Sequence, residues 1–263
     1  MVFVLAVNIF VPGIALLLMK NSSFKSLSPS ETDRFLSERG KNCNFKEARQ
    51  KSEFWLFSIS FGILVGISIM IDENQSSIAL NNVQRTEYNR KIYALFEVLG
   101  AFASGVFLSL FRIYVSTYGL FMFYCFALFV SQFLLFFIEL TSFALFASTL
   151  IAGFATGGSF MIAGQIAIED YGAKHFSKML GIFFTAAGVG MLLFDEVMFQ
   201  YMYYWYNLSD PDQGRNYYGR WNKYIFLITI LSSGLGFAMS IGAYVKTRKN
   251  DGNKDKIASF VNF

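Results

Sequence analysis

Seven long apolar segments dominate the sequence, and they constrain its fold more than any other feature. They lie near residues 2–19, 53–71, 92–111, 118–138, 141–168, 177–200 and 223–245. Each is long enough to cross about 30 Å of hydrocarbon as an α-helix that rises about 1.5 Å per residue. None alternates polar and apolar residues as the strands of a membrane β-barrel do. The sequence therefore predicts an all-α, polytopic transmembrane bundle of about seven spans.

The composition agrees with this fold and argues against several classes of function. Charged residues make up 15% of the chain, whereas a soluble domain carries about a quarter. Cys43 lies in a polar stretch and Cys125 in an apolar one, so we expect no disulfide. The single histidine, His175, lies in a basic turn and is interpreted as a solvated loop residue. These features predict no catalytic residues, no metal site, no cofactor and no nucleic-acid partner.

The basic residues lie between the apolar segments and predict the topology. Most of them fall in four places: residues 20–52, Arg112, residues 174–178 and the tail 246–263. The loops on the other side carry fewer. Because positive loops stay on the cytoplasmic side, the N-terminus is predicted outside and the C-terminus inside. The chain then divides into a lone helix (1–19), a polar inner-side loop (20–52), a six-helix bundle (53–245) and a basic inner-side tail (246–263).

Glycines recur inside the predicted spans at a spacing that brings them to one helix face. The second span contains Gly62-x-x-x-Gly66 and the fifth contains Gly153-x-x-x-Gly157. Small residues let helix backbones approach closely where lipid supplies no hydrophobic drive. The pattern predicts tight helix packing. A second interpretation is that the fifth and sixth spans, the latter with Gly181, Gly188 and Gly190, slide or bend against a partner during transport.

One stretch is more specific than the spans themselves. Residues 153–190, GFATGGSFMIAGQIAIEDYGAKHFSKMLGIFFTAAGVG, join two glycine-bearing spans through an acidic residue, Tyr-Gly and a short basic turn. They resemble helices ten and eleven of nodulin-like transporters in the major facilitator superfamily. Residues 62–82 and 97–112 are similar to helices seven and eight of that family. The positions that match its motifs are Asp72, Asn74, Gly153, Gly157, Glu169 and Gly172.

The resemblance implies a fold and a register. Residues from about 50 to 245 correspond to the C-terminal six-helix half of such a transporter, and residues 20–52 to the loop between its halves. A facilitator-type transporter binds its solute between two halves that rock against each other. The sequence supplies one half and one further helix. We therefore expect a half-transporter retained as an accessory subunit, a half-size chain that pairs with another, or a truncated gene model.

Four polar residues inside the predicted spans are candidates for a proton path: Glu97, Asp195, Glu196 and Gln165. Charged groups within a span are costly and mark functional sites. Three of the four are carboxylates, and all three are predicted in the outer part of the bundle. One interpretation is a proton-coupling cluster of Glu97 with Asp195 or Glu196. The alternatives are a wetted outer funnel, ion pairs with outer-loop arginines, or contacts with another subunit.

Two functions follow from these expectations. The first is a non-catalytic accessory subunit of a large membrane complex, such as a respiratory assembly of the mitochondrial inner membrane. The second is a transporter for a small organic anion, such as a monocarboxylate, that acts as a dimer of half-size chains. Both predict an integral membrane protein whose partners are the lipid bilayer and either other membrane-protein subunits or a second copy.

Overall fold

The structure is a computed structural model that describes residues 45–75, 83–111, 115–137, 142–202, 204 and 218–261. The predicted helix 1–19, and the predicted loop 20–52 up to residue 44, lie outside these ranges. The described elements are α3 (Phe45–Ala48), α4 (Ser52–Glu73), α6 (Val83–Phe111), α7 (Thr117–Phe137), α8 (Ser142–Tyr171), η1 (Ala173–His175), α9 (Phe176–Met191), η2 (Leu192–Gln200) and α11 (Tyr218–Val261).

Six of these helical stretches are long and apolar enough to cross a membrane. They run over Ser52–Glu73, Glu87–Phe111, Thr117–Phe136, Phe143–Tyr171, Phe176–Gln200 and Tyr224–Arg248. They coincide with six of the seven predicted spans and confirm an all-α transmembrane bundle. The last helix differs from the prediction, because α11 continues to Val261 through most of the predicted tail. The sequence after residue 245 contains no proline to end it.

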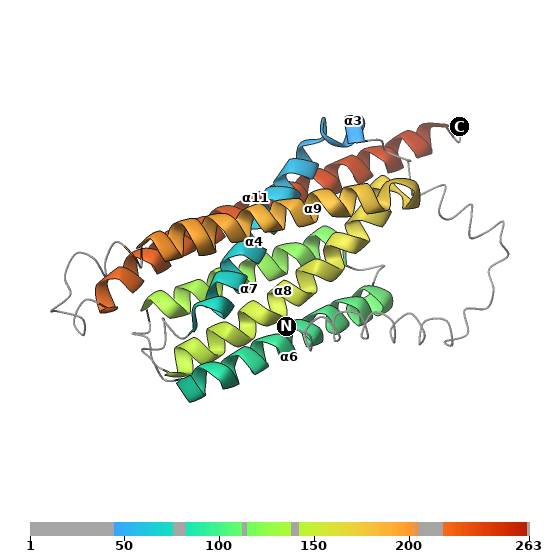
Figure 1. Ribbon diagram of the computed structural model, residues 1–263. Coiled ribbons are helices and arrows are strands. Elements are labelled where there is room, and N and C mark those ends of the chain that lie inside the picture. The colour runs from blue at the N-terminus through green and yellow to red at the C-terminus, as the bar shows by residue number, and fades with distance from the viewer. Residues whose placement is uncertain are drawn as a thin grey trace.

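The six spans lie alongside one another in one bundle (Figure 1), and the pairs that they form follow an inverted repeat. The closest helix pairs are α6 with α8, α4 with α9, α7 with α8, α4 with α11, and α7 with α11. Exchanging the triplet α4–α6–α7 for the triplet α8–α9–α11 converts the first four pairs into one another and leaves the pair of α7 with α11 unchanged. The two triplets run in opposite directions, because an odd number of reversals separates α4 from α8. Nested three-helix repeats of inverted topology are typical of facilitator-type transporter halves.

The contact between α4 and α9 is made by glycines. A Cβ atom added at Gly62 would lie 2.6 Å from the carbonyl oxygen of Ala186, and one at Gly66 would lie 2.5 Å from that of Gly190. No side chain fits between these backbones. The predicted packing role of the first glycine motif is therefore confirmed. It makes α4 the innermost span, with 72% of its most apolar window buried.

The contact between α6 and α8 repeats this arrangement. A Cβ atom at Gly153 would lie 2.6 Å from the carbonyl oxygen of Tyr93, and one at Gly157 would lie 1.7 Å from that of Glu97. In both helix pairs the second glycine follows the first by four residues, and the two helices run parallel. The second glycine motif is thus confirmed as a packing surface at the equivalent place in the other repeat.

Aromatic rings fill the space where α4, α7, α8 and α9 meet. Phe57 lies with its ring centroid 4.6 Å from that of Phe121 on α7 and 4.8 Å from that of Phe183 on α9. Phe54 makes an edge-to-face contact with Tyr171 at the end of α8, at 5.8 Å. Such pairs stabilise a core beyond their buried area. They fix the first turns of α4 beside the last turn of α8.

A single glycine ends α8. Gly172 has a φ of 81°, in the left-handed region that favours glycine, and its N–H donates to the carbonyl of Ile168 at 3.1 Å. The 3₁₀ turn η1 follows and leads into α9. This predicted motif position therefore has a structural role, since it sets the sharp reversal between two spans.

Candidate functional site

Polar side chains gather where α4 ends, and we call this group the α4 cluster: Asp72, Glu73, Asn74, Gln75, Arg90, Asp195 and Gln200. Asn74 is at its centre and is buried. Its Nδ2 donates to the carbonyl of Met70 at 2.9 Å and to Oδ1 of Asp195 at 2.5 Å. Its Oδ1 accepts a bond from Nε2 of Gln200 at 3.3 Å. The amide thus ties the end of α4 to η2.

The π-helical geometry of η2 decides which carboxylate takes part. Asp195 is half-buried and accepts the bond from Asn74, whereas Glu196 is exposed. π-Helical turns are rare and occur mostly at functional sites. Although the two carboxylates are adjacent in sequence, the structure places them in different environments. Only Asp195 belongs to the α4 cluster.

Arg90 on α6 caps the carboxyl end of α4. Its Nη2 donates to the carbonyl of Glu73 at 2.7 Å, and its Nε donates to that of Asp72 at 3.3 Å. The same Nη2 lies 3.3 Å from Oε2 of Glu73. Carbonyl groups at a helix C-terminus have no partner within the helix and attract cations. This cap joins α6 to α4 at the end where the loop between them begins.

Glu97, a predicted proton-path residue, lies on α6, and its backbone carbonyl faces Gly157 of α8. The carboxylate of Asp72 at the end of α4 is close enough to that of Glu97 for the two charges to repel each other. Asp72 also accepts a bond from Nε2 of Gln75 at 3.3 Å. Gln75 is fully buried, and among the described residues its Oε1 has no hydrogen-bond partner. Asp72 and Gln75 therefore belong to the α4 cluster through a direct bond, whereas Glu97 lies outside it and acts on Asp72 only through its charge.

A second polar group lies where α8 ends, and we call it the α8 cluster: Thr117, Tyr118, Gln165, Glu169 and Asp170. Glu169 accepts a bond from Oγ1 of Thr117 at 2.6 Å and one from Nε2 of Gln165 at 2.8 Å. Tyr118 donates its hydroxyl to Oδ2 of Asp170 at 2.5 Å. These bonds join the first turn of α7 to the last turns of α8.

The bond between Thr117 and Glu169 offers a direct test of this joint. Changing Thr117→Val removes a buried hydroxyl that donates to a carboxylate, so we expect the free energy of unfolding to fall by about 1–2 kcal/mol. Thr185→Val is the matched control, because the Thr185 hydroxyl is exposed and bonds only within its own helix, to Gly181. Denaturation of the purified variants in detergent measures both. Equal stability of the two would show that the joint contributes nothing.

The two clusters occupy equivalent places in the inverted repeat. Asn74 follows Gly66 by eight residues, and Gln165 follows Gly157 by eight residues. Each carboxamide donates to a carboxylate: Asp195 in the first case and Glu169 in the second. Each cluster also joins the two triplets, since one links α4 to η2 and the other links α8 to α7. The result is one polar joint at each end of the bundle.

Several members of these clusters were not singled out from the sequence. Asn74, Asp72, Asp195, Gln165 and Glu169 were candidates. Arg90 was expected only as one of the outer-loop arginines that could pair with a carboxylate. The others were missed: Glu73, Gln75, Thr117, Tyr118, Asp170 and Gln200. The one sequence feature that these residues share is that each lies within a turn or two of the end of a predicted span. Such residues are usually solvated, and the sequence does not show which of them are buried.

The fold and the two clusters define an all-α integral membrane protein in which two inverted helix triplets are held together at both ends. No protein-family model, no curated protein and no solved structure matches the chain.

Proposed function

We propose that this chain is the rigid six-helix unit of a small-solute transporter and that it works by rocking against an opposing helical bundle. The observation that carries the proposal is the inverted repeat in the packing of the six spans. Transporters built this way alternate access by moving one rigid bundle against another around a central site. The resemblance of residues 50–245 to nodulin-like transporters supports the same function.

Rigidity is the property that such a unit needs, and the described contacts supply it. Backbone-to-backbone contacts hold α4 against α9 and α6 against α8. The α4 and α8 clusters fasten the two triplets at opposite ends. Packed interfaces of this kind do not deform gradually. The bundle therefore moves as one body, and the movement takes place where its surface meets another bundle. A second copy of the chain or a separate six-helix region would provide that surface.

Transport is tested with the purified full chain in liposomes. The solutes tried first are labelled small monocarboxylates, as the resemblance implies, with preloaded unlabelled solute to drive exchange. We expect exchange above that of protein-free liposomes, by a species that migrates on a native gel at the size of a dimer. Exchange should be lost in the variant Gly157→Leu, whose added side chain forces α6 away from α8.

A contrasting result would favour a structural role. If the chain extracted from its native membrane migrates only within a large assembly, and the reconstituted chain exchanges none of a broad panel of organic anions, the transport proposal fails. The chain would then be an accessory subunit of that assembly. Fractionation of the native membranes would show whether the assembly lies in the mitochondrial inner membrane, as the sequence analysis expects for that role.

A further inference from the structure

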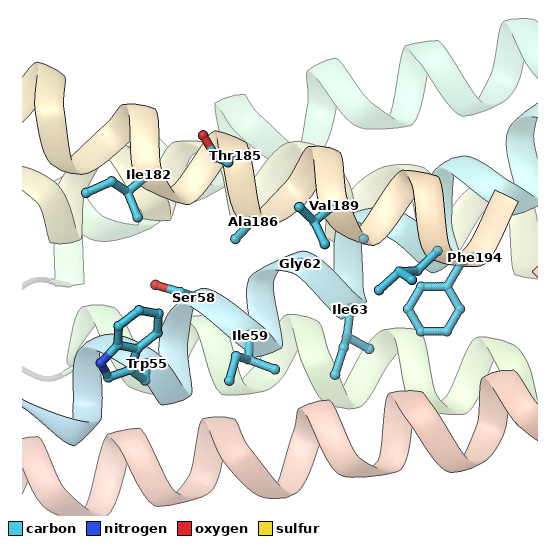
Figure 2. Close-up of a pocket in the computed structure, with 12 residues that line it drawn as sticks. Trp55, Ser58, Ile59, Gly62, Ile63, Ile182, Thr185, Ala186, Val189 and Phe194 are labelled. Carbon is cyan, nitrogen blue, oxygen red and sulfur yellow. The ribbon is translucent and has the colours of Figure 1, made fainter. Parts of the chain in front are cut away.

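An apolar groove of about 380 Å³ runs along the outside of α4 beside α9. Its floor is Gly62 and its walls include Trp55, Ile59, Ile182 and Val189 (Figure 2). None of the described residues that line it is charged. Along α9 and η2 the groove extends from Ile182 to Phe194, which is ~18 Å at 1.5 Å per residue. This length matches one leaflet, about half of a 30 Å hydrocarbon layer.

The groove exists because of the glycine contact described above. Gly62 and Gly190 draw the backbones of α4 and α9 together, and neither carries a side chain that could fill the space outside the contact. The exposed residues around it are large and apolar: Trp55 and Ile59 on α4, and Val189 on α9. The groove therefore opens on the surface of the described bundle, away from the rings that fill the bundle interior.

Basic side chains surround the end of the groove at Trp55. Lys51 lies four residues before Trp55 on α4, and Lys178 lies four residues before Ile182 on α9, so each is one turn beyond a wall of the groove. Lys246 on α11 reaches the same end, where its ammonium donates to the hydroxyl of Ser52.

Each of two ammonium groups is oriented by an aromatic ring. The Nζ of Lys51 lies 5.9 Å from the ring centroid of Tyr171, and the Nζ of Lys178 lies 5.3 Å from that of Phe45. The described acids near this end are Glu47, which is exposed, Glu53, and the pair Glu169 and Asp170 before Tyr171, which accept bonds within the α8 cluster. The indole of Trp55 donates to the carbonyl of Arg49 at 2.8 Å, as expected for a ring at a membrane interface. Cations thus outnumber the acids at the mouth that lie outside the α8 cluster.

We propose that the groove binds one anionic phospholipid of the leaflet on the basic side. An acyl chain occupies the apolar groove, and the phosphate lies among Lys51, Lys178 and Lys246. Basic sites between transmembrane helices on the cytoplasmic side bind acidic head groups in this way. A spanning helix is about 10 Å wide and about 30 Å long, so it is far too large for this volume. The proposal does not depend on transport.

Native mass spectrometry of the full chain tests the site. The chain, delipidated in detergent, is titrated separately with phosphatidylglycerol and with phosphatidylcholine of the same acyl chains. We expect one tightly retained phosphatidylglycerol per chain and much weaker retention of phosphatidylcholine. Lys51→Gln and Lys178→Gln should each weaken phosphatidylglycerol binding about fivefold and leave phosphatidylcholine unchanged, because a basic residue near an anionic surface contributes about that much.

The acyl part of the site is tested by filling it. Val189→Trp places a bulky ring in the groove and should reduce the binding of both lipids. Leu231→Trp is the control, since Leu231 is also apolar and exposed but lies on α11 outside the groove. A circular dichroism spectrum and a gel-filtration profile identical to those of the unmodified chain show that each variant is folded. If Val189→Trp is misfolded, Ile59→Phe replaces it, because Ile59 also lines the groove and the larger ring should likewise reduce the binding of both lipids.

Three results would overturn the proposal. The first is equal retention of the two lipids by the unmodified chain. The second is unchanged binding in Val189→Trp. The third concerns a photo-crosslinker placed at position 185 in native membranes. The proposal fails if this crosslinker reacts with a polypeptide, either residues 1–44 of this chain or another protein, rather than with lipid.

Discussion

Gly157→Ala is expected to lower the free energy of unfolding by about 2–3 kcal/mol, although the change adds only one methyl group. The new Cβ would lie 1.7 Å from the carbonyl oxygen of Glu97, and the backbone of α6 has no freedom to retreat without separating from α8 along its length. Overpacking a close contact costs this much. In an open helix position the same change would stabilise, because alanine favours the helix by about 1 kcal/mol over glycine.

Gly164 provides the matched control on the same helix. Nothing lies within 4 Å of the Cβ that would be added there. Gly164→Ala is therefore expected to leave stability unchanged or raise it slightly, so the two variants should differ in the sign of the effect. Thermal unfolding of both proteins in one detergent, followed by gel filtration, measures the difference. If the two variants unfold at the same temperature, α6 and α8 do not pack through their backbones.

Asp195→Leu and Glu196→Leu are expected to differ strongly although the two residues are adjacent. Leucine at position 195 leaves Nδ2 of the buried Asn74 without its carboxylate acceptor, which costs about 2–3 kcal/mol for a bond to a charged group. Leucine at position 196 removes an exposed charge from an apolar span and costs nothing there. Chemical denaturation in detergent compares the two variants with the unmodified chain.

Asp195→Asn separates the hydrogen bond from the charge. An asparagine at 195 still presents an oxygen to Asn74, so most of the stability lost in Asp195→Leu should return. Losses of similar size in Asp195→Leu and Glu196→Leu would mean that η2 does not hold the two carboxylates in different environments.

The spans and their packing glycines could be predicted because both follow from the solvent. Hydrocarbon requires a helix long enough to cross it, and that length is visible in the sequence. Close approach of two helices requires small residues, so the glycines at 62, 66, 153 and 157 were found from spacing alone. The partner of each glycine pair was not visible, because Gly62 contacts a residue more than a hundred positions away.

The polar clusters were harder to predict, since they depend on geometry that no local pattern encodes. A π-helix over Leu192–Gln200 turns Asp195 toward Asn74 and leaves Glu196 exposed. The sequence of this segment predicts only the end of a transmembrane span and does not indicate a π-helix. Glu169 was found as a motif position, but its donor Thr117 comes from another helix. Pairings of this kind depend on where the two triplets meet.

The helices of the first triplet pack mainly against helices of the second triplet, which follows it in the chain. This order determines when the bundle can assemble. The innermost span, α4, is synthesised before the helices that cover its glycine face and its flank, namely α9 and α11. Until those helices enter the membrane, Ser60 and Ser68 of α4, which are fully buried in the finished bundle, are exposed to lipid or to other proteins. The helices that α4 contacts most are far from it in sequence. The chain between them must close into a loop before these contacts can form, which costs entropy. Assembly is therefore completed late, after the last span has been inserted, and a chain that ends early leaves α4 without the helices that cover it.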